Sequence, residues 1–139
     1  MMPAISRYMT KQPWTIARSA SLADAHELMR EHHLRHLPVL DNGELVGIVS
    51  VRDLHLLETI GESPLDDISV DEAMSENPFI VTGDMPLDEV AEIMAAKKYG
   101  SAIVSGRAGV EGIFTTTDAC RALASILQHA QLEEAVGTD

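Results

Sequence analysis

The chain has 139 residues, 45% hydrophobic and 23% charged, which is enough for one domain or two small units that share a core. Its formal net charge of -12 argues against non-specific binding to a nucleic-acid duplex or an anionic membrane, because both need clustered lysine and arginine. No apolar run approaches the ~20 residues that span a bilayer, and the single cysteine can form no internal disulfide, so we expect a cytoplasmic protein.

An internal repeat organises the chain, with an offset of 65 residues that needs no insertion. Identical pairs at this offset are Met9 with Met74, Pro13 with Pro78, Leu22 with Leu87, Gly47 with Gly112 and Asp53 with Asp118. We therefore predict two repeats at 3–58 and 68–125, a connector at 59–67, and a C-terminal helix end and tail at 126–139.

In the first repeat, the extended piece "PWTI" precedes a helix, where Ser21 and Asp24 form a capping-box pattern. Leu22, Ala25 and Met29 then lie on one helical face. Two strands follow, "HLPVLD" and "ELVGIVS", and the Asn-Gly pair between them predicts a tight hairpin turn. The stretch "VRDLHLLETI" predicts the closing helix.

The second repeat gives the same order: "PFIV", a helix after Pro86, a hairpin in "SAIVSGRAGVEGIF", and a helix in "TTDACRALASILQHAQLEEA". The predicted fold class is α/β (α+β), with two β-α-β-β-α units. One unit alone would expose its apolar sheet face, so we expect the two to pack about a pseudo-two-fold axis.

A hydroxyl and an aspartate recur at the end of the second strand of each repeat, as Ser50-x-x-Asp53 and Thr115-x-x-Asp118. This pattern can cap the following helix. It can also hold a ligand, because a helix N-terminus suits a phosphate and an aspartate can accept hydrogen bonds from two neighbouring hydroxyls, as on a ribose. A glycine three residues before each hydroxyl would let the backbone approach closely.

The run "HLPVLDNGELVGIVSVRDL" and its weaker second copy "SAIVSGRAGVEGIFTTTD" resemble a tandem pair of cystathionine β-synthase (CBS) domains, a Bateman module. In the second copy, Ser101 begins the stretch that replaces His-Leu-Pro-Val, and Gly106 replaces the aspartate. The resemblance implies a regulatory module, not an enzyme, that binds an adenosine-containing ligand in clefts between the repeats. The expected ligands are AMP, ADP, ATP or S-adenosylmethionine, possibly as a magnesium complex.

The resemblance also implies a division of labour in which the hydroxyl binds phosphate and the aspartate binds ribose. The candidate residues at the helix starts are Ser50, Arg52, Asp53, Thr115, Thr116, Thr117 and Asp118, with Arg35 and His36 adding charge across the axis. Candidates for the base pocket are Ile5, Tyr8, Leu34, Leu37, Ile68, Ala73, Tyr99 and Ser101. For most of these pocket residues, core packing is an equally good explanation.

Two other interpretations stand beside this one. The histidines in "HELMREHHLRH" invite a metal site, but adjacent histidines on a helix point about 100° apart, so we predict none. The stronger alternative is a ligand-free module that only dimerises and docks a partner protein. In either case we expect a homodimer through apolar residues of the helices after the two motifs: Leu54, Leu56, Leu57, Leu123, Ile126 and Leu127.

Overall fold

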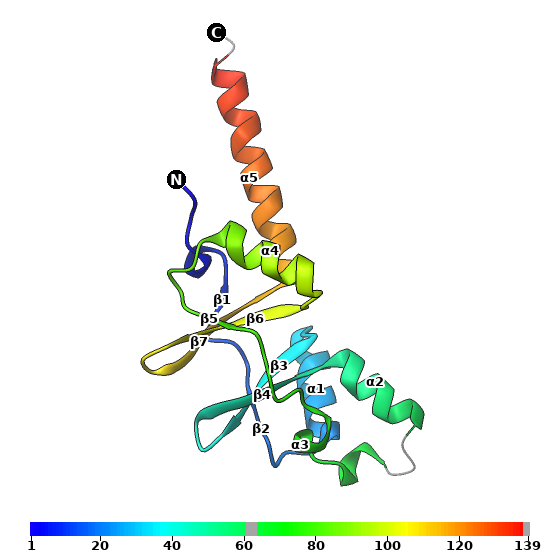
Figure 1. The fold of residues 1–139 in the computed structure, drawn as a ribbon. Coiled ribbons are helices and arrows are strands. Elements are labelled where there is room, and N and C mark those ends of the chain that lie inside the picture. Colours follow the sequence, from blue (N-terminus) through cyan, green and yellow to red (C-terminus); the bar gives the residue numbers. More distant parts are fainter. Residues whose placement is uncertain (61–63, 138–139) are drawn as a thin grey trace.

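The structure, a computed structural model, describes residues 1–60 and 64–137 and is a mixed α/β fold of two halves (Figure 1). One half has a three-stranded sheet of order β2-β3-β4. Its elements are β2 (Ile16–Ala17), α1 (Leu22–His32), β3 (His36–Asp41), β4 (Glu44–Ser50), α2 (Val51–Ile60), the short 3-10 helix η2 (Leu65–Asp67) and α3 (Val70–Ala73). Leu22, Leu37 and Val49 are fully buried in its core.

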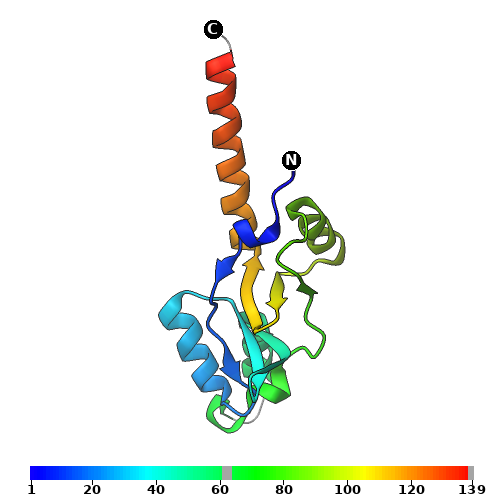
Figure 2. The same ribbon diagram turned by 90° about the vertical axis from the view of Figure 1, so that its left-hand side faces the viewer.

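The other half has a four-stranded sheet of order β1-β7-β6-β5. Its elements are the 3-10 helix η1 (Ile5–Arg7), β1 (Thr10–Lys11), β5 (Ile80–Val81), α4 (Leu87–Lys97), β6 (Ser101–Gly106), β7 (Gly109–Thr115) and α5 (Thr116–Gly137). Val90, Val104 and Phe114 lie in its core. Figures 1 and 2 both show α5 continuing well beyond the sheet, away from the other half.

The predicted β-α-β-β-α order is confirmed in both repeats. The strand registers also repeat at the offset of 65, since Ile16 pairs with Val39 in parallel and Val81 pairs with Val104 in parallel. The first hairpin turns at Asn42, where φ is 51°, and at the following glycine. Parts of the predicted connector and tail, 61–63 and 138–139, lie outside the described residues.

The first residues of each repeat pack on the half formed by the other repeat. The amide of Ile5 donates to the carbonyl of Met85 at 2.8 Å, and the amide of Val70 donates to the carbonyl of Ala20 at 2.8 Å. At the offset of 65, Ile5 corresponds to Val70 and Ala20 corresponds to Met85. Exchanging the two repeats therefore turns one bond into the other, as a pseudo-two-fold axis requires. The boundaries 3–58 and 68–125 stay a sequence prediction, and in space the first residues of each repeat lie across the axis.

The N-terminal segments that lie across the axis pass close to two glycines, and we call them the crossing segments. A Cβ on Gly47 would lie 2.6 Å from the carbonyl oxygen of Ser75, whose backbone pairs with β4. A Cβ on Gly112 would lie 2.9 Å from the carbonyl oxygen of Thr10 in β1 and would also overlap Met9. A close approach to these two glycines is therefore present, but the group that approaches them is backbone of the same chain and not a ligand.

Candidate functional site

Two cavities lie beside the two hydroxyl–aspartate motifs. The first, which we call the Thr115 cleft, has a volume of about 500 Å³ and lies between the loop after β1, the C-terminal end of α1 and the start of α5. The second, the Ser50 cleft, has a volume of about 1000 Å³ and lies between the start of α2, the end of α1 and the loop after α4. Both volumes suit a small organic ligand.

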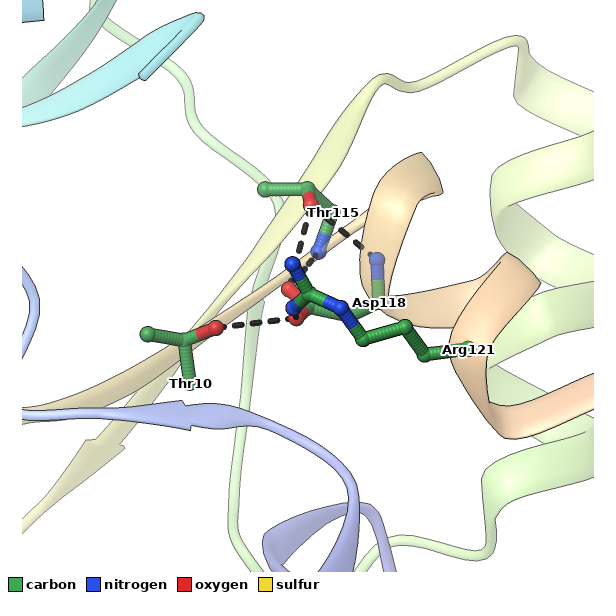
Figure 3. A network of polar contacts seen from close by, with 4 residues as sticks. All are labelled: Thr10, Thr115, Asp118 and Arg121. Atoms are coloured by element: carbon green, nitrogen blue, oxygen red, sulfur yellow. Dashed lines mark hydrogen bonds and ion pairs between the residues drawn. The ribbon is translucent and has the colours of Figure 1, made fainter. Parts of the chain in front are cut away.

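Asp118 is the most heavily bonded side chain at the Thr115 cleft (Figure 3). It is only 4% exposed, and its Oδ2 accepts hydrogen bonds from the Thr115 amide at 2.8 Å and the Thr115 hydroxyl at 3.0 Å. Its Oδ1 accepts from the Thr10 hydroxyl at 2.8 Å and from Arg121 at 3.3 Å. Asp118 therefore both caps α5 and ties β1 to the start of that helix.

The corresponding motif at the Ser50 cleft makes only local bonds. Asp53 accepts from the Ser50 amide at 2.8 Å and the Ser50 hydroxyl at 2.9 Å, and its own amide donates back to that hydroxyl at 3.2 Å. All of these accepted bonds reach Oδ2, and no group in the described part of the chain donates to Oδ1. The half-buried Asp53 carboxylate thus keeps acceptor capacity that Asp118 has already used.

Basic side chains gather around the two clefts despite the acidic composition. Lys11, Arg35 and Arg121 line the Thr115 cleft, and Arg35 also lines the Ser50 cleft together with Arg52 and Lys98. These five are half of the ten lysine and arginine residues in the chain. No carboxylate lines the Ser50 cleft among the described residues. Asp118, which is paired with Arg121 at 3.3 Å, is the one carboxylate in the lining of the Thr115 cleft among the described residues, so basic side chains outnumber carboxylates at both clefts.

The family model for the CBS domain matches residues 5–56 and 67–125. The chain belongs to the CBS domain family. The two halves of the fold are therefore two CBS repeats, and the clefts lie where these repeats meet.

Solved structures of CBS proteins share this fold. AcuB from Vibrio cholerae, a protein named for acetoin utilization, matches with 30% identity and a TM-score of 0.85, covering 94% of this chain and 97% of AcuB. The CBS domain pair of protein MJ0100, solved with 5′-methylthioadenosine and S-adenosyl-L-methionine, matches with 25% identity and a TM-score of 0.81, covering 90% and 98%. CBSX2, solved with AMP, matches with 26% identity and a TM-score of 0.79, covering 89% and 98%.

The chain spans 66%, 51% and 53% of the length of the first curated relatives that it matches. Similarity to these relatives therefore concerns only part of their length.

The CBS repeats place most of the predicted polar residues in the clefts. Leu34, Arg35 and His36 line both clefts, so the end of α1 and the start of β3 form a shared wall. The predicted residues Thr115, Thr116, Thr117 and Asp118 line one cleft, and Ser50 and Arg52 line the other. Asp53 is bonded to Ser50 beside that lining without being part of it.

The hydroxyls of the two motifs are engaged differently from the sequence expectation. Each hydroxyl donates its proton to the aspartate of its own motif, at 2.9 Å for Ser50 and 3.0 Å for Thr115. A hydroxyl has one proton, so neither can donate to a phosphate while its cap is intact. Other side chains of the lining can donate to an anion, among them the basic residues and, in the Thr115 cleft, the exposed hydroxyls of Thr116 and Thr117.

His36 offers hydrogen bonds rather than charge. Burial lowers the pKa of its imidazole; the Asp53 carboxylate opposes this shift and the Arg35 guanidinium adds to it. The ring is therefore neutral at pH 7, and its Nδ1 is buried with no partner among the described residues. The positive charge predicted for the shared wall comes from Arg35 alone.

Of the residues proposed for a base pocket, only Leu34 lines a cleft in the part of the chain that the structure describes. Ile5 and Leu37 are fully buried in the two cores, and Ser101 is 8% exposed. The other four pack against a core or an aromatic neighbour: Tyr8, Ile68, Ala73 and Tyr99. Ile5, Tyr8, Ile68 and Ala73 belong to the N-terminal segments of the repeats, which pack on the core across the axis.

The sequence missed several residues that line the clefts: Thr10, Lys11, Trp14, His32, His33, His55, Lys98 and Arg121. A signal existed for one of them, since Arg121 follows Asp118 by three residues, which is helical pairing distance. Lys98 and His33 are equivalent at the offset of 65, and both residues end a helix in the left-handed conformation.

Within 1–60 and 64–137, no group of three or more His, Cys, Asp and Glu side chains is arranged to hold a metal ion. In the same residues, no helix combines the length and the hydropathy needed to cross a bilayer.

Proposed function

We propose that this CBS pair is a regulatory module that binds an anionic, adenosine-containing ligand in the clefts between its repeats. The observation that carries the proposal is the convergence of five basic side chains on two clefts of an acidic protein. The ligands seen with two similar CBS proteins, AMP in CBSX2 and 5′-methylthioadenosine and S-adenosyl-L-methionine in MJ0100, support the adenosine class.

In this proposal the basic residues bind the phosphate and an aspartate binds the ribose. Arg35 and Arg52 donate charge-assisted hydrogen bonds to the phosphate, and such bonds are stronger than those of neutral donors. The Asp53 carboxylate retains an oxygen that can accept from a ribose hydroxyl. The local positive charge makes AMP and the polyphosphates ADP and ATP all suitable, and magnesium would matter mainly for ATP.

A ligand-free interaction module is the second candidate. The complete hydrogen bonding of the Thr115–Asp118 cap favours it, because that motif already has a structural purpose. The module's location in the cytoplasm and its docking to a regulated protein remain predictions under both candidates.

A thermal-shift panel separates the two candidates. We expect AMP, ADP, ATP with and without Mg²⁺, or S-adenosylmethionine to raise the midpoint of thermal unfolding by roughly 5–10 °C at a hundredfold excess over Kd, because a ligand of the folded state stabilises it. An unchanged midpoint with every ligand at millimolar concentration would leave the interaction module as the better account.

Replacing Arg35 by alanine should weaken AMP binding roughly ten- to hundredfold, because a charge-assisted hydrogen bond to the phosphate is lost. Arg107→Ala is the matched control, since Arg107 is exposed in the β6–β7 turn and lines neither cleft. Fluorescence or calorimetric titration with AMP measures the effect. Equal affinity for the two variants would show that Arg35 does not bind the anion.

We further propose a homodimer formed through α2 and α5. Leu56, Leu123 and Leu127 are each 58% exposed, and Ile126 is 44% exposed, so these helices present apolar side chains to solvent. Leu54, which was predicted to belong to this surface, is instead 1% exposed in the core of the first half.

The dimer is tested by light scattering after size exclusion. The wild-type chain should run at twice its mass of 15.1 kDa, and Leu127→Asp should shift it to the monomer because a charge would be buried in the interface. Gln128→Asp adds the same charge at the neighbouring exposed position and should leave the mass unchanged. A wild-type chain that runs as a monomer would contradict the proposed dimer.

A further inference from the structure

The only tryptophan of the chain lies at the Thr115 cleft. Trp14 is in the segment that connects β1 to β2, lines the cleft, and is 52% exposed. A half-exposed indole would usually be mobile, but this one is stacked on the imidazole of His32, with ring centroids 4.0 Å apart and an angle of 17° between the planes. The indole is thus held in place without being buried.

Stacking on His32 covers one face of the indole, and about half of the Trp14 residue stays exposed where it lines the cleft. Cations stand around the same cavity, at Lys11, Arg35 and Arg121. An aromatic platform next to a cluster of cations suits a ligand with a flat base at one end and a phosphate at the other, because bases stack on aromatic side chains regardless of their identity.

The Ser50 cleft lacks this feature. Phe79, the residue related to Trp14 by the offset of 65, packs on the core of its own half and against Tyr99, with ring centroids 5.2 Å apart. No Trp, Tyr or Phe from the described residues lines the Ser50 cleft. The pseudo-symmetry of the fold is therefore broken in the one property that would distinguish a nucleotide from a plain anion.

We propose that Trp14 is the base-stacking residue of the Thr115 cleft, so that this cleft selects anions carrying an aromatic base, while the Ser50 cleft binds through its basic side chains and the Asp53 Oδ1 oxygen without stacking the base. This inference rests on the proposed function and adds to it a division of specificity between the clefts. His32 acts as a positioning residue, since it holds the indole plane through the stack.

The single tryptophan makes the test direct, because the intrinsic fluorescence of the wild-type chain reports on this cleft. AMP should change the fluorescence in a saturable way, and ribose 5-phosphate, which has the phosphate and no base, should bind more weakly and leave the emission nearly unchanged. By calorimetry, Trp14→Ala should weaken the binding of AMP to this cleft roughly ten- to hundredfold and leave ribose 5-phosphate unaffected. Trp14→Phe keeps an aromatic face and should retain affinity within about threefold.

The outcomes separate this inference from the proposed function. If wild type binds AMP and Trp14→Ala binds it with the same affinity, the base-stacking role is wrong and the regulatory site stands. If Trp14→Ala loses AMP and ribose 5-phosphate equally, Trp14 shapes the cleft without selecting a base, and the inference is again overturned. If wild type binds none of the adenosine ligands, the proposed function fails and this inference fails with it. Thermal unfolding of each variant confirms that it is folded, as expected for an exposed residue.

Discussion

Asp118→Ala should lower the midpoint of thermal unfolding by roughly 10 °C, about three times the effect of Asp53→Ala. Both variants lose a helix cap, which costs about 1 kcal/mol. Asp118→Ala also removes the bond from Thr10 that ties β1 to α5, and it leaves a buried site without its acceptor, for a total of about 3 kcal/mol. Thermal unfolding followed by circular dichroism measures the difference.

Thr10→Val tests the hydrogen bond between β1 and α5 by itself, because it removes the hydroxyl that donates to Asp118 and leaves the helix cap intact. Its loss of stability should account for much of the difference in stability between Asp118→Ala and Asp53→Ala. Equal stability of Asp118→Ala and Asp53→Ala would mean that the bond across the repeats contributes nothing. The motif alone suggests that Asp118→Ala would remove ligand binding with little loss of fold, and the structure revises that expectation because Asp118 is a structural residue.

Gly47→Ala and Gly112→Ala should each destabilise the protein by about 3 kcal/mol, or prevent folding, because the added methyl group meets backbone. At Gly47 it would overlap the carbonyl of Ser75, and at Gly112 the carbonyl of Thr10, neither of which can rotate away like a side chain. The crossing segments would then have to leave the sheet edge. Chemical denaturation of each variant measures the loss.

Gly83→Ala is the matched control, since the nearest atom to its added Cβ is the Cβ of Ser6 at 3.4 Å, an ordinary contact. We expect it to be neutral or slightly stabilising, because alanine restricts the unfolded chain. The two crossing glycines should also behave alike, as equivalent positions of a pseudo-two-fold fold. If Gly112→Ala were as stable as Gly83→Ala, the crossing of β1 over β7 would be misplaced.

The elements could be predicted because their signals are local. The offset of 65 aligned the β-α-β-β-α elements of the two repeats, and the Asn42-Gly43 pair marked the first hairpin turn. The periodicity of apolar residues does not predict which of the two cores an apolar segment will pack against. Ile5 and Ile68 are base-pocket candidates by sequence, yet each packs with the core across the axis. That choice depends on tertiary packing, which one sequence does not reveal.

The site could be predicted in residue type but not in role. Ser50, Thr115 and Arg35, which the sequence proposed as ligand-binding residues, line the clefts. They did not reveal that both hydroxyls give their protons to the caps, since donor direction depends on the folded geometry. Trp14 read as part of a strand, and only the folded structure shows its indole held at a cleft by His32. Net charge was a poor guide, because the basic residues cluster where an anion would bind.

The most direct test of the central claim is an isothermal titration of the purified chain with AMP at low and moderate salt. The account predicts saturable binding with a Kd below about 1 mM that weakens as salt rises, because cations around the clefts bind the phosphate. Absence of any binding heat for AMP, and likewise for ADP, ATP and S-adenosylmethionine at millimolar concentration, would contradict the claim that these clefts sense an adenosine ligand.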